Sequence, residues 1–449
     1  MAMEVNETKQ LKSKPCCRVL VVGAGLGGLA AAVGIKRAGH DVMVIERMPE
    51  LREIGAGIQV PPNSSKILKE WGILEDIVSR AVQPHDIAIH SYKDGRVLTT
   101  QILDPAMQQA YGAPYLVIHR AEYLKALVKE AKELGITIQL GSVVERIDFA
   151  KTSILLEGGK TLDADLIIGA DGERSFCRDS LLGHPDPPHP SGDIVFRTVI
   201  PVEKLQNDPA LTGLIDPPAV HFWLGPDAHA LAYMLGDGLL NLVLIHPDFP
   251  GAQATFGPQP ADMDQIRNSV KQWDSDFKKL LDVAQQANKW ILVECHDLPS
   301  WTHPVGNFTL LGDSAHAMLP YLAQGAAQAI EDAAFLSGLL SHLELKSQIS
   351  DILSIYERHR KPRAMQVKRR TLATREINGM VDGPLQQERD RQLSEHKPFD
   401  GYPNPLADPT FSDWLFGYDA NEEAEKAWKT YKKGEWPLTS GMWQTRYHT

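Results

Sequence analysis

Cysteine is scarce in this chain of 449 residues, which has only Cys16, Cys17, Cys177 and Cys295. None of the four forms a C-x-x-C pair, so the sequence offers neither a disulfide framework nor a cysteine-based zinc site. We therefore expect no metal centre. Free thiols are typical of a reducing compartment and favour a cytoplasmic protein.

Long apolar runs are missing too. The one candidate, residues 19–35, is slightly shorter than a membrane span and contains five glycines, which favour a strand, a turn and a helix instead. Residues 1–14 are polar and lack the apolar core of a signal peptide, so we expect residues 1–15 to form a flexible tail. No membrane association is predicted.

An excess of positive charge is also absent. Lysine and arginine together number 46 against 57 aspartates and glutamates, which gives a formal net charge of -11. The phosphates of a nucleic acid would repel such a chain, so no nucleic-acid partner is expected. Net charge does not identify a substrate, and a local basic pocket is compatible with it.

The first clear pattern is a strand, a helix and a second strand. Residues 18–22 are an apolar run suited to a buried parallel strand, and residues 29–37 are an alanine-rich helical stretch that ends before Gly39. Residues 41–46 form a second apolar run that ends in an acid. This order predicts an α/β fold that binds a nucleotide.

The glycine-rich turn between this strand and helix has the pattern G-x-G-x-x-G. Gly23 permits the tight turn, Gly25 lets a pyrophosphate approach the backbone, and Gly28 lets the helix pack on the strand. Glu46, at the end of the second strand, can accept hydrogen bonds from ribose hydroxyls. Its charge would repel a 2′-phosphate, so the predicted ligand is FAD or NAD rather than NADP.

Two further turns follow apolar runs. Asp171 and Gly172 come after residues 165–170, although Asp-Gly after a strand is by itself usually a plain turn. Asp313 follows the run 308–311, and Gly325 opens a helical stretch twelve residues later. An aspartate there can bind a ribityl or ribose hydroxyl, and the helix N-terminus can face the flavin edge that becomes anionic on reduction.

Together these motifs resemble the group A flavin monooxygenases, the aromatic hydroxylases, and within them the salicylate hydroxylase-like branch that includes many fungal enzymes. The resemblance covers roughly residues 16–370. It is strongest at Gly-Ala-Gly-Ile-Gln (55–59), at His119-Arg120, at 170–172 and at 312–334. The tail from 371 adds little to it; from 398 it reads as irregular until a helical stretch at 420–431.

The resemblance implies an α/β fold of the para-hydroxybenzoate hydroxylase type. We expect a discontinuous Rossmann-type FAD-binding domain (16–82, 112–183 and 296–345), an inserted β-sheet substrate domain (83–111 and 184–295) and a helical C-terminal segment with a tail (346–449). The residues that it implies for FAD binding are Gly23, Gly25, Gly28, Glu46, Gly57, Arg120, Asp171, Asp313, Gly325 and Ala326. Asp171-Gly172 is expected to serve NAD(P)H as well.

The implied reaction uses NAD(P)H and O2 to hydroxylate a small phenol or aromatic acid through a flavin C4a-hydroperoxide, with decarboxylation where a carboxylate lies beside the phenol. Two alternatives stay open. The same chemistry serves dearomatising hydroxylation or epoxidation in secondary metabolism, and a flavin-binding protein without turnover would keep the same motifs. The sequence does not indicate the substrate, the choice of NADH or NADPH, or the oligomeric state.

Candidates for substrate chemistry lie in the β-rich middle of the chain. Arg197 stands inside the apolar run 194–200, where a guanidinium must be paired or meet a ligand. His229 and Tyr233 are four residues apart on a predicted strand and so share a face. The family places an arginine and a tyrosine similarly to hold a phenolate, so we predict this role for Arg197 and Tyr233, with His229 as a proton relay. A structural ion pair and simple core packing are the alternatives. His316 is more simply explained as the cap of its turn.

Overall fold

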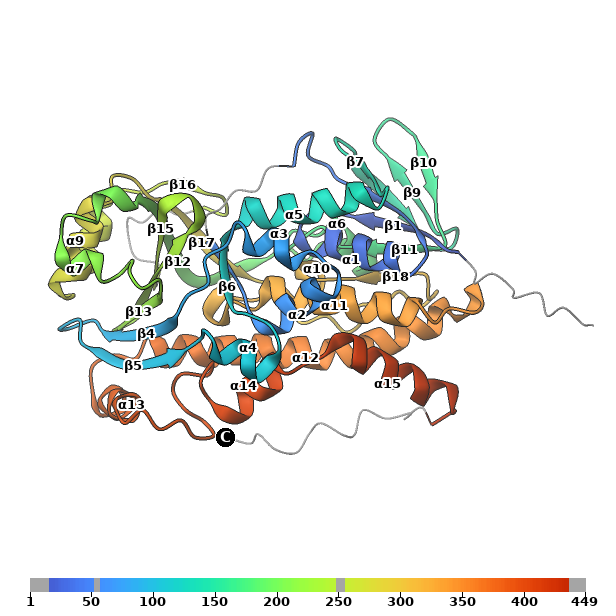
Figure 1. Ribbon diagram of the computed structural model, residues 1–449. Coiled ribbons are helices and arrows are strands. Elements are labelled where there is room, and N and C mark those ends of the chain that lie inside the picture. The colour runs from blue at the N-terminus through green and yellow to red at the C-terminus, as the bar shows by residue number, and fades with distance from the viewer. Residues whose placement is uncertain (1–15, 52–56, 248–254, 436–449) are drawn as a thin grey trace, which may run out of the picture.

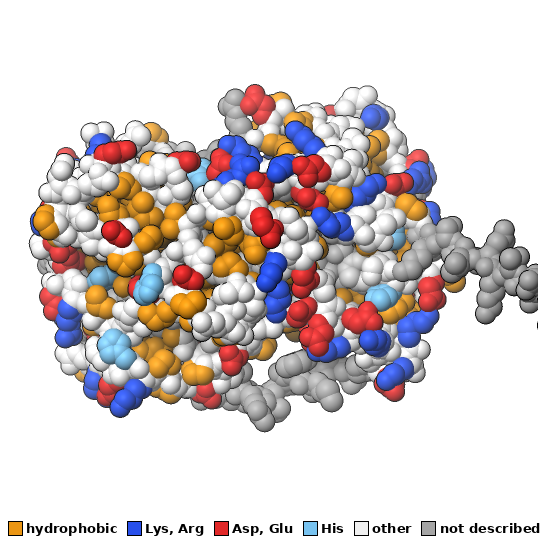
Figure 2. Space-filling model, in the orientation of Figure 1, with side chains coloured by type: hydrophobic (Ala, Val, Ile, Leu, Met, Phe, Trp, Pro, Cys, Tyr) orange, Lys and Arg blue, Asp and Glu red, His pale blue; other side chains and the backbone are white. Residues whose placement is uncertain are grey.

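The computed structural model describes residues 16–51, 57–247 and 255–435, and Figure 1 shows two sheets side by side with long helices beneath them. The expected flexible tail, residues 1–15, lies outside this part. Within the described residues, no helix is long and apolar enough to cross a membrane. On the face shown in Figure 2, acidic and basic side chains are interspersed.

The first sheet has five parallel strands in the order β18-β11-β1-β2-β7. The strands are β1 (Arg18–Val22), β2 (Asp41–Ile45), β7 (Thr137–Gln139), β11 (Leu166–Gly169) and β18 (Phe308–Leu310). Helices α1 (Leu26–Arg37), α5 (Arg120–Glu133) and α11 (Gly325–Leu340) pack on it through buried apolar faces. Because the strands are parallel, the turns after β1, β2, β11 and β18 meet at one edge of the sheet.

The second sheet has eight strands in the order β16-β17-β12-β15-β14-β13-β4-β5, and only β13 and β4 run parallel. The predicted hairpin at 236–238 joins β14 to β15, with Asp237 at a φ of 64°. The strands are β4 (Asp86–Ser91), β5 (Val97–Ile102), β12 (His189–Pro201), β13 (Val220–Gly225), β14 (Ala228–Leu235), β15 (Leu239–Pro247), β16 (Gln259–Pro260) and β17 (Asn288–Glu294).

The two faces of this sheet differ. The outer face buries Phe196, Trp223 and Leu242 against helices α7 (Pro209–Thr212), α8 (Met263–Ser269) and α9 (Ser275–Val283). The inner face carries Arg197 and Tyr233, because residues opposite one another in paired strands point the same way. Apolar side chains of this inner face pack against the segment between β18 and α11.

Smaller elements connect the two sheets. The ribbon of β3 (Gly57–Val60) and β6 (Leu116–His119) is antiparallel and places Gly57 opposite His119. The other elements are α2 (Pro62–Glu70), α3 (Leu74–Val78), α4 (Ala106–Tyr111), β8 (Val144–Asp148), β9 (Ser153–Leu156), β10 (Thr161–Asp163), α6 (Phe176–Leu182) and α10 (Asp313–His316).

The C-terminal segment is more regular than the sequence predicts. It comprises α12 (Ile349–Asn378), α13 (Pro384–Ser394), α14 (Pro409–Phe416) and α15 (Ala420–Lys432). The prediction of an irregular chain from 398 to 420 was wrong at α14. Asp408 caps that helix by accepting the N–H of Phe411, a proline occupies its first turn, and Leu415 and Phe416 are buried.

Candidate active site

The glycine-rich turn after β1 has the geometry that its three glycines predict. Gly23 has a φ of +107°, and a Cβ there would overlap the carbonyl oxygen of Ala170. A Cβ on Gly28 would overlap the carbonyl oxygen of Gly23, so only glycine lets α1 sit this close to β1. At Gly25 a Cβ would meet nothing within 4 Å, so the backbone there is open to a ligand.

Glu46 lies beside this turn. Its carboxylate accepts the N–H of Ala24 at 2.9 Å and the N–H of Met48 at 2.8 Å. Both bonds leave lone pairs on the two oxygens for further donors. The acid at the end of β2 is thus fixed next to the open backbone at Gly25, where a ribose hydroxyl would be within its reach.

The side chain of Asp171 serves its own loop. Its carboxylate accepts the hydroxyl of Ser175 and, at 3.0 Å, the N–H of Cys177, at the start of α6. The neighbouring Gly172 has a φ of +85°. The Asp171 side chain therefore stabilises the turn after β11. A ligand at this turn would be bound by backbone groups rather than by the carboxylate.

The segment 312–316, which we call the cofactor turn, follows β18. Gly312 has φ 66° and ψ -142°, a conformation that favours glycine, and the next residue, Asp313, is exposed. A Cβ on Gly325 would lie 3.8 Å from Oδ1 of Asp313, so the turn stands beside the start of α11. Gly325 and Ala326 are partly exposed there, and the free N–H groups of a 16-residue helix favour an anion.

Arg120 connects the two sheets electrostatically. Desolvation and the charge of Asp313 raise the pKa of Glu173, and Arg120 lowers it. Arg120 also lowers the pKa of Arg197. The arginine that opens α5 is therefore within electrostatic reach of Glu173, which Asp313 of the cofactor turn also influences, and of Arg197 on the inner face of the second sheet.

Tyr233 and Gly57 are in direct contact. A Cβ on Gly57 would overlap the phenol ring of Tyr233, so only glycine fits at that position. The N–H of Gly57 donates to Oδ1 of Asn241 at 3.3 Å, and Asn241 stands opposite Tyr233 in the β14–β15 pair. These contacts join the ribbon that holds Gly57 to the predicted substrate residues.

Arg197 lacks a carboxylate partner within the described residues. Its Nε is buried without a hydrogen-bond partner, and its guanidinium lies 5.6 Å from the ring centre of Trp290. Burial lowers the pKa of Arg197, and the neighbouring Tyr233 raises it. A half-buried cation of this kind is a strong site for an anionic ligand, because no carboxylate of the described residues is paired with it.

Tyr233 keeps its proton at neutral pH. Burial raises the pKa of Tyr233 to about 12, although the charge of Arg197 opposes this shift. The hydroxyl is therefore a neutral hydrogen-bonding group beside a guanidinium.

His229 shares the inner face with Tyr233, as predicted, but its surroundings are different. It is buried, and its ring centre lies 5.1 Å from that of Tyr321. Tyr321 donates its hydroxyl to Asp193, which Arg375 holds through two nitrogens. Burial lowers the pKa of His229 to about 4, so this ring is neutral at physiological pH.

His316 is part of a buried cluster rather than a simple cap of its turn. Its Nε2 lies 2.6 Å from Oδ2 of Asp332, and both side chains are fully buried. The cap position before α10 belongs to Gly312.

Sequence reasoning overlooked two polar residues at this site. Asn241 is fully buried and its Nδ2 has no partner among the described residues. The signal for it was a single amide inside the apolar run 239–245. Tyr321 comes from the segment after the cofactor turn, and no local pattern distinguishes it from an ordinary core tyrosine.

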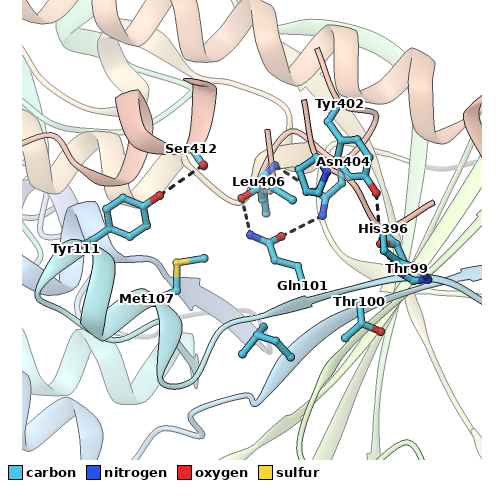
Figure 3. A pocket seen from close by; sticks show the side chains of 13 residues that line it. Thr99, Thr100, Gln101, Met107, Tyr111, His396, Tyr402, Asn404, Leu406 and Ser412 are labelled. Atoms are coloured by element: carbon cyan, nitrogen blue, oxygen red, sulfur yellow. Dashed lines mark hydrogen bonds between the residues drawn. The ribbon is translucent and has the colours of Figure 1, made fainter. Parts of the chain in front are cut away.

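A cavity of roughly 320 Å³ lies elsewhere, between the edge strand β5 and the C-terminal segment (Figure 3). Its polar groups bind one another: Asn404 donates to Gln101, Gln101 donates to the carbonyl of Leu406, and Thr99 faces His396. None of the predicted site residues lines it. We therefore place the candidate active site at the inner face and not in this cavity.

Comparison with known proteins identifies the family. The family model described as "FAD binding domain" matches residues 16–239 and 250–371. "FAD-dependent monooxygenase OpS4" of Beauveria bassiana is 38% identical over 417 residues, covering 91% of this chain and 96% of that protein. The chain belongs to the FAD-dependent monooxygenases. "3-amino-4-hydroxybenzoate 2-monooxygenase PtmB3" of Streptomyces platensis is 32% identical to this monooxygenase over 410 residues. The match covers 90% of this chain and 96% of that protein.

Solved structures confirm the predicted fold. CtdE in complex with FAD and a substrate superposes with a TM-score of 0.80 at 22% identity, covering 93% of this chain and 99% of that one. A salicylate hydroxylase substrate complex gives a TM-score of 0.77 at 24% identity, covering 92% and 98%. The expected family, α/β fold and FAD cofactor are thus confirmed. The open backbone at Gly25, the exposed Asp313 and the free start of α11 fit such a cofactor.

Proposed function

We propose that this monooxygenase uses NAD(P)H and O2 to hydroxylate a small phenol or aromatic acid bound at the inner face of the second sheet. The observation that carries the proposal is Arg197, a guanidinium with a buried Nε and no carboxylate partner among the described residues. Its neighbours include Tyr233 and the partly exposed ring of Trp290, and the partly exposed ring of Phe222 lies on the same face, three strands away. This combination suits a flat, anionic ring.

The roles follow from the chemistry of a phenol. Attack by an electrophilic oxygen needs an electron-rich carbon, which the phenolate provides, yet a free phenol has a pKa of about 10. Arg197 would favour the ionised oxygen by direct charge pairing, and Tyr233 would hold that oxygen by a hydrogen bond. Bound FAD, once reduced by NAD(P)H, supplies the activated oxygen. His229, which is neutral and lies four residues before Tyr233 on β14, is our candidate for moving the phenol proton.

The cofactor would lie along the meeting edge of the parallel strands. Gly23, Gly25 and Gly28 would hold its pyrophosphate, Glu46 its ribose, and Asp313 its ribityl chain. Gly57, Arg120, Asp171, Gly325 and Ala326 would complete the contacts around the flavin. We also propose the division into a discontinuous FAD domain and an inserted substrate domain, which the presence of two separate large sheets supports. The cytoplasmic location remains a prediction.

The names of two relatives support an aromatic acid. One acts on 3-amino-4-hydroxybenzoate, and another, "6-hydroxynicotinate 3-monooxygenase" of Bordetella bronchiseptica, is 31% identical over 363 residues. Both named substrates join a ring hydroxyl to a carboxylate. A carboxylate would give Arg197 a second kind of anionic partner.

The test is a panel of phenols, phenolic acids and non-phenolic aromatic acids with the FAD-loaded enzyme. Substrate-stimulated NAD(P)H oxidation and the mass of each product are measured. We expect phenolic members to stimulate oxidation and to gain one oxygen, with loss of CO2 where a carboxylate lies beside the hydroxyl. Stimulation by non-phenolic acids alone, or NAD(P)H oxidation without an oxygenated product for any member, would contradict the proposal.

A further inference from the structure

A buried charge cluster lies directly behind the cofactor turn. It contains Glu331 and Asp332 on α11, Arg360 and Arg363 on α12, and His316 on α10. The side chains of Glu331, Asp332, Arg360 and His316 are all fully buried. Two carboxylates therefore face two guanidinium groups where the dielectric is low, and such a cluster fixes its members firmly only when every group is paired.

Asp332 holds both ends of the cofactor turn. Its Oδ2 accepts the N–H of Gly312 at 3.1 Å and lies 2.6 Å from Nε2 of His316. Its Oδ1 accepts Nε of Arg360 at 2.8 Å. Of the three residues between these two contacts, Asp313 is the exposed one.

The neighbouring Glu331 is a natural comparison. Its carboxylate is bound by Arg360, Arg363, Asn63 and Gln328. Among the described residues, none of its hydrogen bonds reaches the cofactor turn. Glu331 and Asp332 are thus equally buried, lie on the same helix and both pair with Arg360. They differ in that only Asp332 contacts the cofactor turn.

Arg363 extends the cluster to the C-terminal segment. It donates to the carbonyl oxygens of Trp414 at 3.1 Å and Leu415 at 2.9 Å, at the end of α14. Its guanidinium also lies 3.8 Å from the ring centre of Tyr418. Because Arg363 also pairs with Glu331, it links the C-terminal segment to α11, the helix whose start is proposed to face the flavin.

We propose that Asp332 is a positioning residue for FAD: by holding Gly312 and His316 it sets the cofactor turn so that Asp313 presents its carboxylate to the cofactor. Asp332 itself is fully buried and acts through Asp313. The turn needs such support because Gly312 adopts φ 66° and ψ -142°, which its neighbours in sequence do not impose.

The experiment compares Asp332→Asn with Glu331→Gln. In Asp332→Asn one acceptor oxygen must serve three donors, so either the turn or Arg360 loses its partner. Each variant is purified as holoenzyme, and its FAD dissociation constant is measured from the recovery of flavin fluorescence on dilution. Loss of a hydrogen bond to a charged group predicts a rise of about tenfold or more for Asp332→Asn. For Glu331→Gln we expect a lower melting temperature but a dissociation constant within about twofold of wild type.

If Asp332→Asn does not fold, His316→Gln tests the same contact between Asp332 and the cofactor turn. It should weaken FAD binding more than Glu331→Gln does. Equal weakening by the Asp332 or His316 variant and the Glu331 variant would mean general destabilisation and would overturn the proposal. Unchanged affinity in the Asp332 or His316 variant would do the same.

A double-mutant cycle with Asp313→Asn gives a readout that a merely structural role would not move. If Asp332 acts through Asp313, the loss of affinity caused by Asp332→Asn becomes smaller in the Asp313→Asn background. Full additivity of the two losses would show that Asp332 acts elsewhere. Because only FAD binding is measured, the outcome does not depend on which substrate the enzyme hydroxylates.

Discussion

Two arginines with buried side-chain nitrogens show how differently one residue type is used in this molecule. Arg360, beneath α11, donates to Asp332, Glu331 and Gln328, and none of its side chain is exposed. Arg197, on the inner face of the second sheet, has an aromatic neighbour but no carboxylate partner among the described residues. Burial lowers the pKa of both groups, but for Arg360 the charges of Glu331 and Asp332 reverse the direction.

The difference teaches how to separate structure from function. A buried charged side chain whose hydrogen bonds are all satisfied stabilises the fold, and its removal leaves the oppositely charged side chains buried without a partner. A buried charge without a partner destabilises the folded chain, so it persists where a ligand completes it. The predictions below test that distinction.

The largest effect is expected from Arg360→Met. Glu331 and Asp332 would lose a shared partner inside the core, and breaking a buried ion pair from one side costs about 3–5 kcal/mol of unfolding free energy. Urea unfolding of the holoenzyme measures this cost. A variant as stable as wild type would show that Arg360 does not hold the cluster together.

Arg197→Met should reduce activity without reducing stability, in contrast to Arg360→Met. We expect kcat/KM for the best phenolic substrate to fall by roughly 10²- to 10³-fold, as for loss of a positioned charge-stabilising group. Unfolding free energy should stay equal or rise, since an unpaired, half-buried charge is removed, and FAD should remain bound. Arg197→Lys is the matched control and should recover part of the activity. Wild-type turnover in Arg197→Met would remove the residue from the site.

Tyr233→Phe has a smaller expected effect. The ring still packs on Gly57, so stability and bound FAD should be kept, and the loss is one hydrogen bond of about 1–1.5 kcal/mol, or roughly tenfold in kcat/KM. Steady-state kinetics below pH 9 measures it, because the pKa of Tyr233 near 12 keeps the hydroxyl protonated there. An unchanged kcat/KM would assign Tyr233 to packing alone.

The smallest effect concerns pH and the buried His229. Its pKa falls from 6.5 to about 4 on folding, so the unfolded chain binds the extra proton between these values and stability falls as pH drops through that window. We expect a loss of about 1 kcal/mol between pH 8 and pH 5.5 from this residue. Denaturant unfolding of wild type and His229→Asn at both pH values measures it. Equal pH dependence in the two proteins would contradict the assignment.

Local physics explains what the sequence revealed. The turn at Gly23–Gly28 and the acid at Glu46 were predictable because a strand, a glycine turn and a helix are encoded by neighbouring residues. That Tyr233 and His229 share a face followed from the two-residue alternation of strands, whereas the pairing of β12 with β15 is what places Arg197 on that same face. The family resemblance supplied Gly57 and Arg120, whose chemistry the local pattern alone does not indicate.

What stayed hidden depends on contacts between distant segments. Asn241 and Tyr321 matter because strand pairing and the loop after β18 bring them to the inner face, and no spacing in the sequence encodes that encounter. Helix α14 was missed for a similar reason. Its stability comes from burying Phe416 against Tyr111 and Tyr115, which lie more than three hundred residues earlier in the chain, a tertiary contact that helix propensity does not contain.

The hydrogen bonds from Arg363 to Trp414 and Leu415 set an order of events during synthesis. The glycine turn emerges from the ribosome first, whereas Arg363, which binds Glu331 of α11, gains its carbonyl partners only once residues 414 and 415 have been translated. We therefore expect flavin loading to be a late step, and chains truncated before residue 414 to bind the coenzyme more weakly than the full chain.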